Sequence, residues 1–406
     1  MFKNNAMKAG WMLGVTAALC STTSHAQSNV TMYGIIDTGL SYVSNQQVAS
    51  SAGRIAGRSA WSMSTGNMSP TNFGLRGSED LGGGTSAVFN LQSYFLSNNG
   101  ALFQASNLFD ATAIVGLKSD AWGMLTAGRQ FDSYTNALAP FSISNNWAGP
   151  AGAHFGDIDN VNGAFSLNNS VLYTSPTFRG FNVSGTFSFG NHAGAFSSDR
   201  AWAAAVNYTN GPLSLGAGYL SLRNPLTAAL GGSSGYIGEL SCGQSGANYC
   251  GLQDASELRT FGIGAGYTVG ALTLNAMLTR SILVDSEYLT PTGGPVSDVR
   301  FDTAELGGLY NVTPVFQLGL GYSYTQAKIQ ALDSKTNIHK LSLGGIYSLS
   351  KRTQLYLLGS YEKMTGAGLG INPETGAFAN YAQIGYQASS NVSSQFAASV
   401  GIKHAF

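Results

Sequence analysis

The side chains that could perform acid–base or metal chemistry are few and scattered along the chain. Beyond residue 26, histidines stand at His154, His192, His339 and His404, without the close spacing that a zinc site needs. No serine stands in the strand–turn–helix context of a nucleophile elbow. The sequence therefore predicts a protein that is not an enzyme, with no catalytic residue, no metal site and no cofactor.

Two further motifs have structural rather than chemical interpretations. Gly262, Gly264 and Gly266 resemble a nucleotide-binding glycine run, but they alternate along an expected strand and precede no helix. Cys242 and Cys250 enclose a short polar stretch, and in an exported protein such a pair predicts a disulfide that closes one exposed loop. A metal pair is the rival interpretation, and it lacks nearby histidines.

The segment 1–26 has the features of a secretory signal peptide. Lys3 and Lys8 precede the apolar stretch 11–19, and small residues flank the expected cleavage site after Ala26. Lipidation at Cys20 is disfavoured because Leu19 precedes it, where a small residue is needed. We therefore expect residues 27–406 to form the exported protein as a single domain.

The composition is unusual for a protein in water. Charged residues make up 10% of the chain, against about 25% in ordinary globular domains. The sequence contains no apolar run of about 18 residues that would form a transmembrane helix. The formal net charge of +0 implies no basic surface for nucleic acid, so no nucleic-acid partner is expected.

From residue 180 onward, apolar and polar residues alternate with a period of two, which is typical of β-strands with two different faces. Clear examples are 182–189, 213–219, 272–279 and 316–324. Their apolar face carries no Asp, Glu, Lys or Arg, and a base there would cost roughly 2–4 kcal/mol at the centre of a bilayer. The other face is too small and polar for the dry core of a soluble β-sandwich. The pattern predicts an all-β transmembrane barrel in outer-membrane lipid.

Connections of alternating length set the number of strands. Short connections, from 78–84 to 348–353, alternate with long ones, among them 131–167, 222–257, 282–299 and 364–393. Outer-membrane barrels have short periplasmic turns and long outer loops, so the sequence predicts a sixteen-stranded antiparallel β-barrel. The extended-looking segment 381–386 would make the total odd, and we place it within the eighth long loop.

Aromatic residues recur at fixed positions relative to the turns. Strands end before the short turns in Tyr173, Tyr208, Tyr267, Tyr310 and Tyr347, and the chain ends in Phe406. The opposite strand ends carry Phe95, Phe189, Tyr219, Tyr324 and Tyr361. Rings at two fixed depths predict aromatic girdles at the two membrane boundaries.

A specific motif, FGLRGSEDLGGG, occupies 73–84, and shorter ones lie at 30–37, 128–130, 169–176, 349–353 and 400–406. Together they resemble the trimeric general porins of Gram-negative bacteria, especially the β-proteobacterial branch. The resemblance spans 27–406 and implies a homotrimer through which small hydrophilic solutes and ions diffuse passively across the outer membrane. It also implies that Ile402, His404 and Phe406, on one face of the last strand, are the signal read by the barrel-assembly machinery.

In the porins that this chain resembles, the third long loop folds inward and narrows the channel. Here that loop is about 131–167 and carries Asp132, Asp157 and Asp159, while the wall can present Arg76, Arg58 and Arg129. Acids that face bases across the water would produce a transverse field that orients polar solutes and screens ions. The alternative is that these charges are merely solvated. By strand parity the lumen wall also includes Asn72, Asn90, Gln92 and Tyr94.

The chain departs from related porins at positions where they often carry a base, namely Asn72, the neighbourhood of Ser166, and Leu172. We therefore expect a weaker charge preference than in these relatives. A substrate-specific uptake channel is the alternative function, and a surface adhesin built on the same barrel is a further one. A specific channel would show a current that its substrate blocks, whereas an adhesin would show little conductance.

Overall fold

The computed structural model of the chain describes residues 29–49, 55–104, 107–225, 249, 252, 254–290, 293–372, 374–385 and 387–406. The expected signal peptide and the expected disulfide between Cys242 and Cys250 lie outside these residues. No helix in the described ranges is long and apolar enough to cross a membrane.

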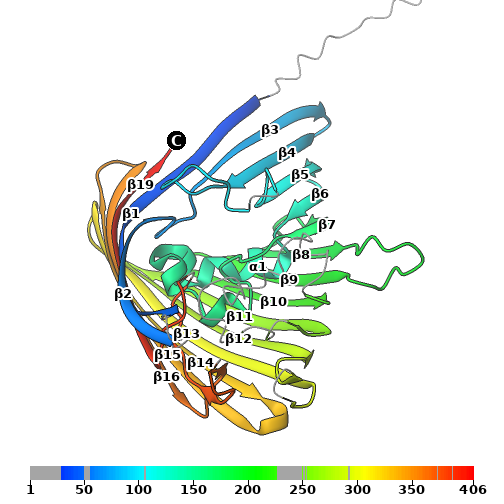
Figure 1. Cartoon of the computed structure of the whole chain (residues 1–406). Coiled ribbons are helices and arrows are strands. Elements are labelled where there is room, and N and C mark those ends of the chain that lie inside the picture. The colour runs from blue at the N-terminus through cyan, green and yellow to red at the C-terminus, as the bar shows by residue number, and fades with distance from the viewer. Residues whose placement is uncertain are drawn as a thin grey trace, which may run out of the picture.

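Antiparallel strands make up most of the structure (Figure 1). The wall strands are β1 (Asn29–Ala49), β2 (Ile55–Thr65), β3 (Asn72–Gly82), β4 (Thr85–Tyr94), β5 (Thr112–Ser119), β6 (Gly123–Gln130), β7 (Leu167–Thr174), β8 (Phe181–Ser188), β9 (Ala201–Asn210), β10 (Leu213–Arg223), β11 (Glu257–Val269), β12 (Leu272–Ser286), β13 (Ser297–Thr313), β14 (Phe316–Ile329), β15 (Ser334–Ser348), β16 (Thr353–Gly366) and β19 (Ser394–Ala405). A separate small hairpin consists of β17 (Gly370–Ile371) and β18 (Phe378–Ala379).

The sheet closes on itself because the first strand pairs with the last. On one side, β1 pairs with β19; on the other, it pairs with β2 along its outer half and with β3 along its first residues. β2 and β3 are therefore two parts of one wall strand, separated by the segment 66–71, and the barrel has 16 strands. Closure leaves no open sheet edge for lipid to meet. The predicted strand number is confirmed.

The connections follow the predicted alternation in part: the four long loops named from the sequence are long, but the connection 330–333 between β14 and β15 is shorter than the turn 175–180 between β7 and β8. At two of the short turns, Gly211 and Gly270 both have φ of +56°, a left-handed conformation that glycine adopts without steric cost. The eighth long connection runs from β16 to β19, and its segment 381–385 forms no strand. That segment is mostly buried, so it belongs to the loop, as expected, and not to the wall.

The two faces of the wall differ in the way that the alternation predicts. On β14, Leu318, Leu320 and Tyr322 are exposed, whereas the intervening Gly319 and Gly321 are buried. Exposed apolar surface is unfavourable in water by roughly 25 cal/mol per Å², so this outer face suits hydrocarbon. The exposed rings of Tyr173, Tyr267, Tyr310, Tyr347 and Phe406 lie next to the short turns or at the chain end, where a girdle was predicted.

Candidate functional site

The connection between β6 and β7 lies inside the ring of strands. It contains the helix α1 (Ser133–Leu138) and the short turns η1 (Ala139–Phe141), η2 (Ser144–Ala148), η3 (Pro150–Gly152) and η4 (Phe155–Asp157), and Figure 1 shows α1 within the ring. α1 contacts β8 to β11, and η3 contacts β15 and β16. We call 131–166 the inner loop, because it runs along the inner face of these strands.

Glycines on the inner face of the wall form the seat of the inner loop. A Cβ at Gly262 would lie 2.4 Å from Cδ1 of Leu138, and a Cβ at Gly319 would lie 2.5 Å from the ring of Trp147. A side chain at either position would force these neighbours to shift, which is harder for the rigid ring of Trp147 than for the flexible end of Leu138. The alternating glycines of β11 are therefore explained by the apolar side chains of the loop, which lie flat on the wall.

Polar side chains of the wall hold the far part of the inner loop. The Lys340 ammonium donates to the carbonyl oxygen of Ala153 at 2.5 Å and lies 3.3 Å from a carboxylate oxygen of Glu362. Glu305 accepts a hydrogen bond of 2.9 Å from the backbone N–H of Ile143. All three wall side chains are buried, where an unpaired charge would be costly. They therefore tie the loop to β13, β15 and β16.

His154 is buried between two carboxylates. Its Nδ1 lies 2.6 Å from Asp159 Oδ2, and its Nε2 lies 3.4 Å from Glu305 Oε2. Burial opposes the charge, but Asp159 and Glu305 outweigh it and raise the pKa of His154 well above its usual value. The Thr279 hydroxyl also donates to Asp159 at 2.6 Å. This cluster is an ion-pair anchor, and no group of His, Cys, Asp and Glu in the described ranges is placed to hold a metal.

The carboxylates of the inner loop accept hydrogen bonds that stabilise the loop itself, and they do not face water. Asp132 caps α1, accepting from the Thr135 N–H at 3.0 Å and from the Thr135 hydroxyl at 2.9 Å. Asp157 accepts from the backbone N–H groups of Asn162 and Ala164, and burial raises its pKa to about 8. Asp132, Asp157 and Asp159 are all buried. The expected field between loop acids and wall bases across open water does not describe this structure, because backbone donors inside the loop bind the acids.

Arg76 lies on the inner face of β3 and is exposed. Its guanidinium carbon stands 5.0 Å from the ring centroid of Tyr33 on β1, and the Tyr33 hydroxyl donates to Asn90 Oδ1 at 2.6 Å. A guanidinium over an aromatic face is held in place without losing its charge. Arg76 is therefore a positioned and exposed base on the inner-face parity of β3.

The other predicted bases lie elsewhere. Arg129 shares the outward parity of Leu125 and Ala127 on β6, and its partner on β5 is Ala113. Its guanidinium donates to the carbonyl oxygens of Asp110 and Ser166 and to Asn168, so it ties strand ends together and does not enter the lumen. Arg58 is exposed near the outer end of β2, opposite Gln46, far along the wall from Arg76.

The four predicted polar wall residues adjoin Arg76. Cross-strand pairs join Arg76 to Asn90 and Asn72 to Tyr94, and Gln92 lies between them on β4. Asn72 is buried and donates to the carbonyl oxygen of Pro70, whereas Gln92 and Tyr94 are half-buried. These residues form one polar patch on β3 and β4, on a part of the wall that is distant from the glycine seat.

Sequence reasoning missed several inner-face charges, among them Asp37 on β1. Asp37 accepts from the backbone N–H groups of Met68 and Ser69, each at 2.8 Å, and from the Tyr356 hydroxyl. It thereby holds the segment 66–71, whose Met68 packs with Trp147 of the inner loop. Charges on the polar parity of strands were the available signal, and they also identify Glu305, Lys340 and Glu362.

Known proteins show the same architecture. The Gram-negative porin family model matches residues 14–366. An outer membrane porin protein of Bordetella pertussis is 30% identical over 403 residues, covering 88% of this chain and 94% of the relative. Outer membrane porin protein 32 of Delftia acidovorans is 29% identical over 411 residues, covering 97% of this chain and 99% of the relative.

Among solved structures, an anion-selective porin from Comamonas acidovorans matches with a TM-score of 0.67 and 26% identity, covering 94% of this chain and 100% of the other. The trimer form of OmpT of Vibrio cholerae has a TM-score of 0.61 and 14% identity, covering 93% and 99%, which bears on the fold alone. The closed 16-stranded barrel and these relatives place the protein in the bacterial outer membrane. The chain belongs to the Gram-negative porin family.

Proposed function

We propose that this porin is a passive diffusion channel for small hydrophilic solutes and ions, with a modest preference for anions. The observation that carries the proposal is the exposure of its inner charges. Among the described residues, six acids of the inner wall and inner loop are buried, and the exposed acid Asp80 lies at the turn end of β3: the buried six are Asp37, Asp132, Asp157, Asp159, Glu305 and Glu362. Arg76 and Arg58 are exposed, and Lys403 is half-buried on the inner parity of β19. Mobile ions therefore meet a positive wall.

The preference should be modest because bases are sparse on this wall. Asn72, Ser166 and Leu172 stand where related porins often carry a base, so Arg76 acts largely alone in its patch. The relative from Comamonas acidovorans is described as anion-selective, which supports the sign of the preference. Membership of the porin family also favours a channel function over an enzymatic one.

The inner loop is the part of the chain that would narrow the channel. It occupies the lumen in front of β8 to β16, which leaves the patch around Arg76 on the opposite part of the wall for solutes. Asp132, Asp157 and Asp159 would shape this constriction by folding the loop and not by contacting ions.

Assembly as a homotrimer is part of the proposal and rests on the resemblance to trimeric porins. Insertion would use the last strand, where Ile402, His404 and Phe406 are exposed on the outer face and are accessible to the barrel-assembly machinery before the barrel closes. Pairing with β1 then completes the wall.

Reconstitution into planar bilayers tests these proposals. We expect stepwise conductance, closure in three equal steps, and a reversal potential in a KCl gradient that favours chloride by a small factor. No conductance would exclude a diffusion channel and favour an adhesin. Saturating block by one solute would favour a substrate-specific channel, and cation preference would contradict the role given to the exposed bases.

A further inference from the structure

The wall strand that β2 and β3 share is interrupted by residues 66–71, which we call the inward segment. Thr65 at the end of β2 pairs with Thr38 of β1, and Asn72 at the start of β3 pairs with Ile35. The six residues of the inward segment therefore stand opposite only two residues of β1 and must leave the sheet. Irregular backbone at membrane depth is tolerated only where protein buries it or where it lines a water-filled cavity, so this segment turns to the inner side of the wall.

Asp37 of β1 supplies the hydrogen bonds that the interrupted ladder lacks. Its carboxylate accepts from the backbone N–H groups of Met68 and Ser69, each at 2.8 Å, and from the Tyr356 hydroxyl on β16. Its backbone N–H donates to the Thr71 hydroxyl oxygen at 3.0 Å, and that hydroxyl donates to its carbonyl oxygen at 2.9 Å. Hydrogen bonds from backbone N–H groups to a carboxylate are among the stronger ones. One buried residue thus fixes the shape of the whole inward segment.

The tip of the inner loop rests directly on the inward segment. Gly149, between η2 and η3, has φ of +62°, and a Cβ there would lie 1.9 Å from the carbonyl oxygen of Asn67 and 3.0 Å from Cα of Met68. The Met68 side chain packs in one buried cluster with Trp147 and Ala148 of the loop. Figure 1 shows the inner loop extending from α1 toward β1 and β2. The contact is backbone against backbone, so the tip cannot come closer to the wall at this point.

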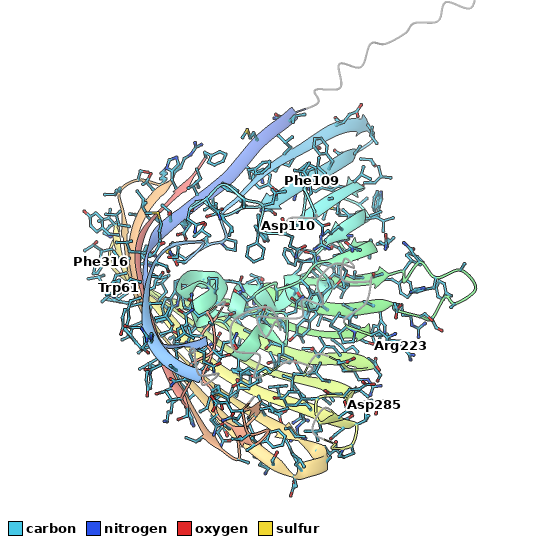
Figure 2. The ribbon with its side chains drawn as sticks, viewed as in Figure 1. Trp61, Phe109, Asp110, Arg223, Asp285 and Phe316 are labelled. Carbon is cyan, nitrogen blue, oxygen red and sulfur yellow. The ribbon has the colours of Figure 1, made fainter. Side chains whose placement is uncertain are left out.

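The inward segment also borders the polar patch around Arg76. The Asn72 side-chain amide in that patch donates to the carbonyl oxygen of Pro70 at 2.8 Å. Figure 2 shows Asp110, whose carboxylate accepts from the Tyr94 N–H of the same patch at 2.7 Å, on the inner side of the ring of strands. The inward segment therefore joins the tip of the inner loop to the part of the wall that the loop leaves uncovered.

We propose that the inward segment is a fixed stop for the tip of the inner loop, and that Asp37 is the positioning residue that holds this stop in place. The inference rests on the proposed channel function and adds to it the element that limits the size of solutes. Lys340 and Glu305 hold the loop against β13 and β15, whereas the inward segment holds its tip beside β1. Without the stop, a large solute can push the tip aside, and the size limit rises because it depends on the width of the pore.

Swelling of liposomes that contain the purified protein, in sugars of increasing length, measures the size limit. Asp37→Ala removes the acceptor of the Met68 and Ser69 N–H groups, so we expect it to admit larger sugars than the parent and to give a larger conductance step in planar bilayers. Asp80→Ala is the matched control, because it removes one exposed acid at the turn end of β3 and leaves the inward segment intact. Equal size limits for Asp37→Ala and Asp80→Ala would overturn the inference.

A second variant disturbs the same contact from the side of the loop. Gly149→Ala places a Cβ against the Asn67 carbonyl oxygen and leaves β1 unchanged, so it tests the stop even if the Asp37→Ala barrel does not fold. It should also raise the size limit. If both residues act through one contact, the double variant should admit no larger sugars than the stronger single variant. Additive effects would show that Asp37 and Gly149 act separately, which contradicts a common stop.

Thiol labelling tests the position of the tip without any need for conduction. Ala148 is 2% exposed, so the thiol in Ala148→Cys should react slowly with a water-soluble maleimide, as followed by mass spectrometry of the peptide. Asp37→Ala should make this reaction several-fold faster, and Asp80→Ala should not. Equal labelling rates would overturn the stop, and faster labelling with an unchanged size limit would overturn its effect on solutes. A parent protein that does not conduct would contradict the channel function, while the labelling rates would still decide whether the stop exists.

Discussion

Two parts of the inner wall both carry charged and polar side chains, but these side chains have different surroundings. On β3, Arg76 stays exposed on the inner-face parity, over the Tyr33 ring of β1. On β13, β15 and β16, Glu305, Lys340 and Glu362 are buried under the inner loop. Charges on one part can act on solutes, whereas those on the other part stabilise the element that shapes the passage. The difference shows that inward parity alone does not identify a pore-lining residue.

Removal of Lys340 should have the largest effect on this comparison. Lys340→Met leaves Glu362 buried without its partner and the Ala153 carbonyl without its donor. Breaking a buried pair in this way costs roughly 3–5 kcal/mol. We expect a lower apparent melting temperature in detergent and noisy conductance as the loop loosens.

The pairing itself is checked by a second variant and a control. Lys340→Met combined with Glu362→Gln should recover much of the lost thermal stability, because the orphaned carboxylate is gone. Lys118→Met, at an exposed position, should change little. Equal melting temperatures for Lys340→Met and Lys118→Met would show that Lys340 does not anchor the loop.

A leucine in the glycine seat should have the next largest effect. In Gly319→Leu, the new side chain would overlap the ring of Trp147, and overpacking of this kind typically costs about 1–3 kcal/mol. We expect a displaced inner loop and a changed conductance step. Gly359→Leu on the outer face is the matched control. A normal conductance step in Gly319→Leu would contradict the claim that the inner-face glycines position the inner loop.

A smaller effect is expected from the charge on His154. Asp159 and Glu305 raise the pKa of His154 well above the usual value of 6.5, so its stabilising contribution is complete below pH 6.5 and is lost as pH rises through the folded pKa. The apparent melting temperature should therefore fall from about pH 6.5 upward. His154→Gln should flatten this part of the profile, and an equally steep decline in the variant would assign the dependence to other groups.

Loss of Arg76 should have almost no effect on stability, because its side chain is exposed. Arg76→Ala should instead shift the reversal potential in a salt gradient toward cations, since one of the few accessible bases is removed. Arg352→Ala in a periplasmic turn serves as the control. An unchanged reversal potential would show that Arg76 does not act on passing ions. The two parts of the wall would then not differ in their effect on ion selectivity.

Much of the fold could be predicted because local patterns encode it. Strand alternation, turn lengths and girdle aromatics together predict a closed 16-stranded barrel, and the structure has one. The outward position of Arg129 was available from the same alternation, because Leu125, Ala127 and Arg129 share one parity on β6. Asp132 and Asp157 lie in a loop without periodicity, so no pattern indicates whether their carboxylates face water or backbone donors.

The sequence by itself determined which face of each strand meets lipid, because a charge or a run of leucines has the same preference for water or hydrocarbon wherever the strand lies. Only the tertiary structure decided which inward charges meet the lumen. The inner loop covers Glu305, Lys340 and Glu362 and leaves Arg76 exposed. That choice depends on contacts between residues far apart in the chain, such as Trp147 on Gly319, which the order of residues along a strand does not contain.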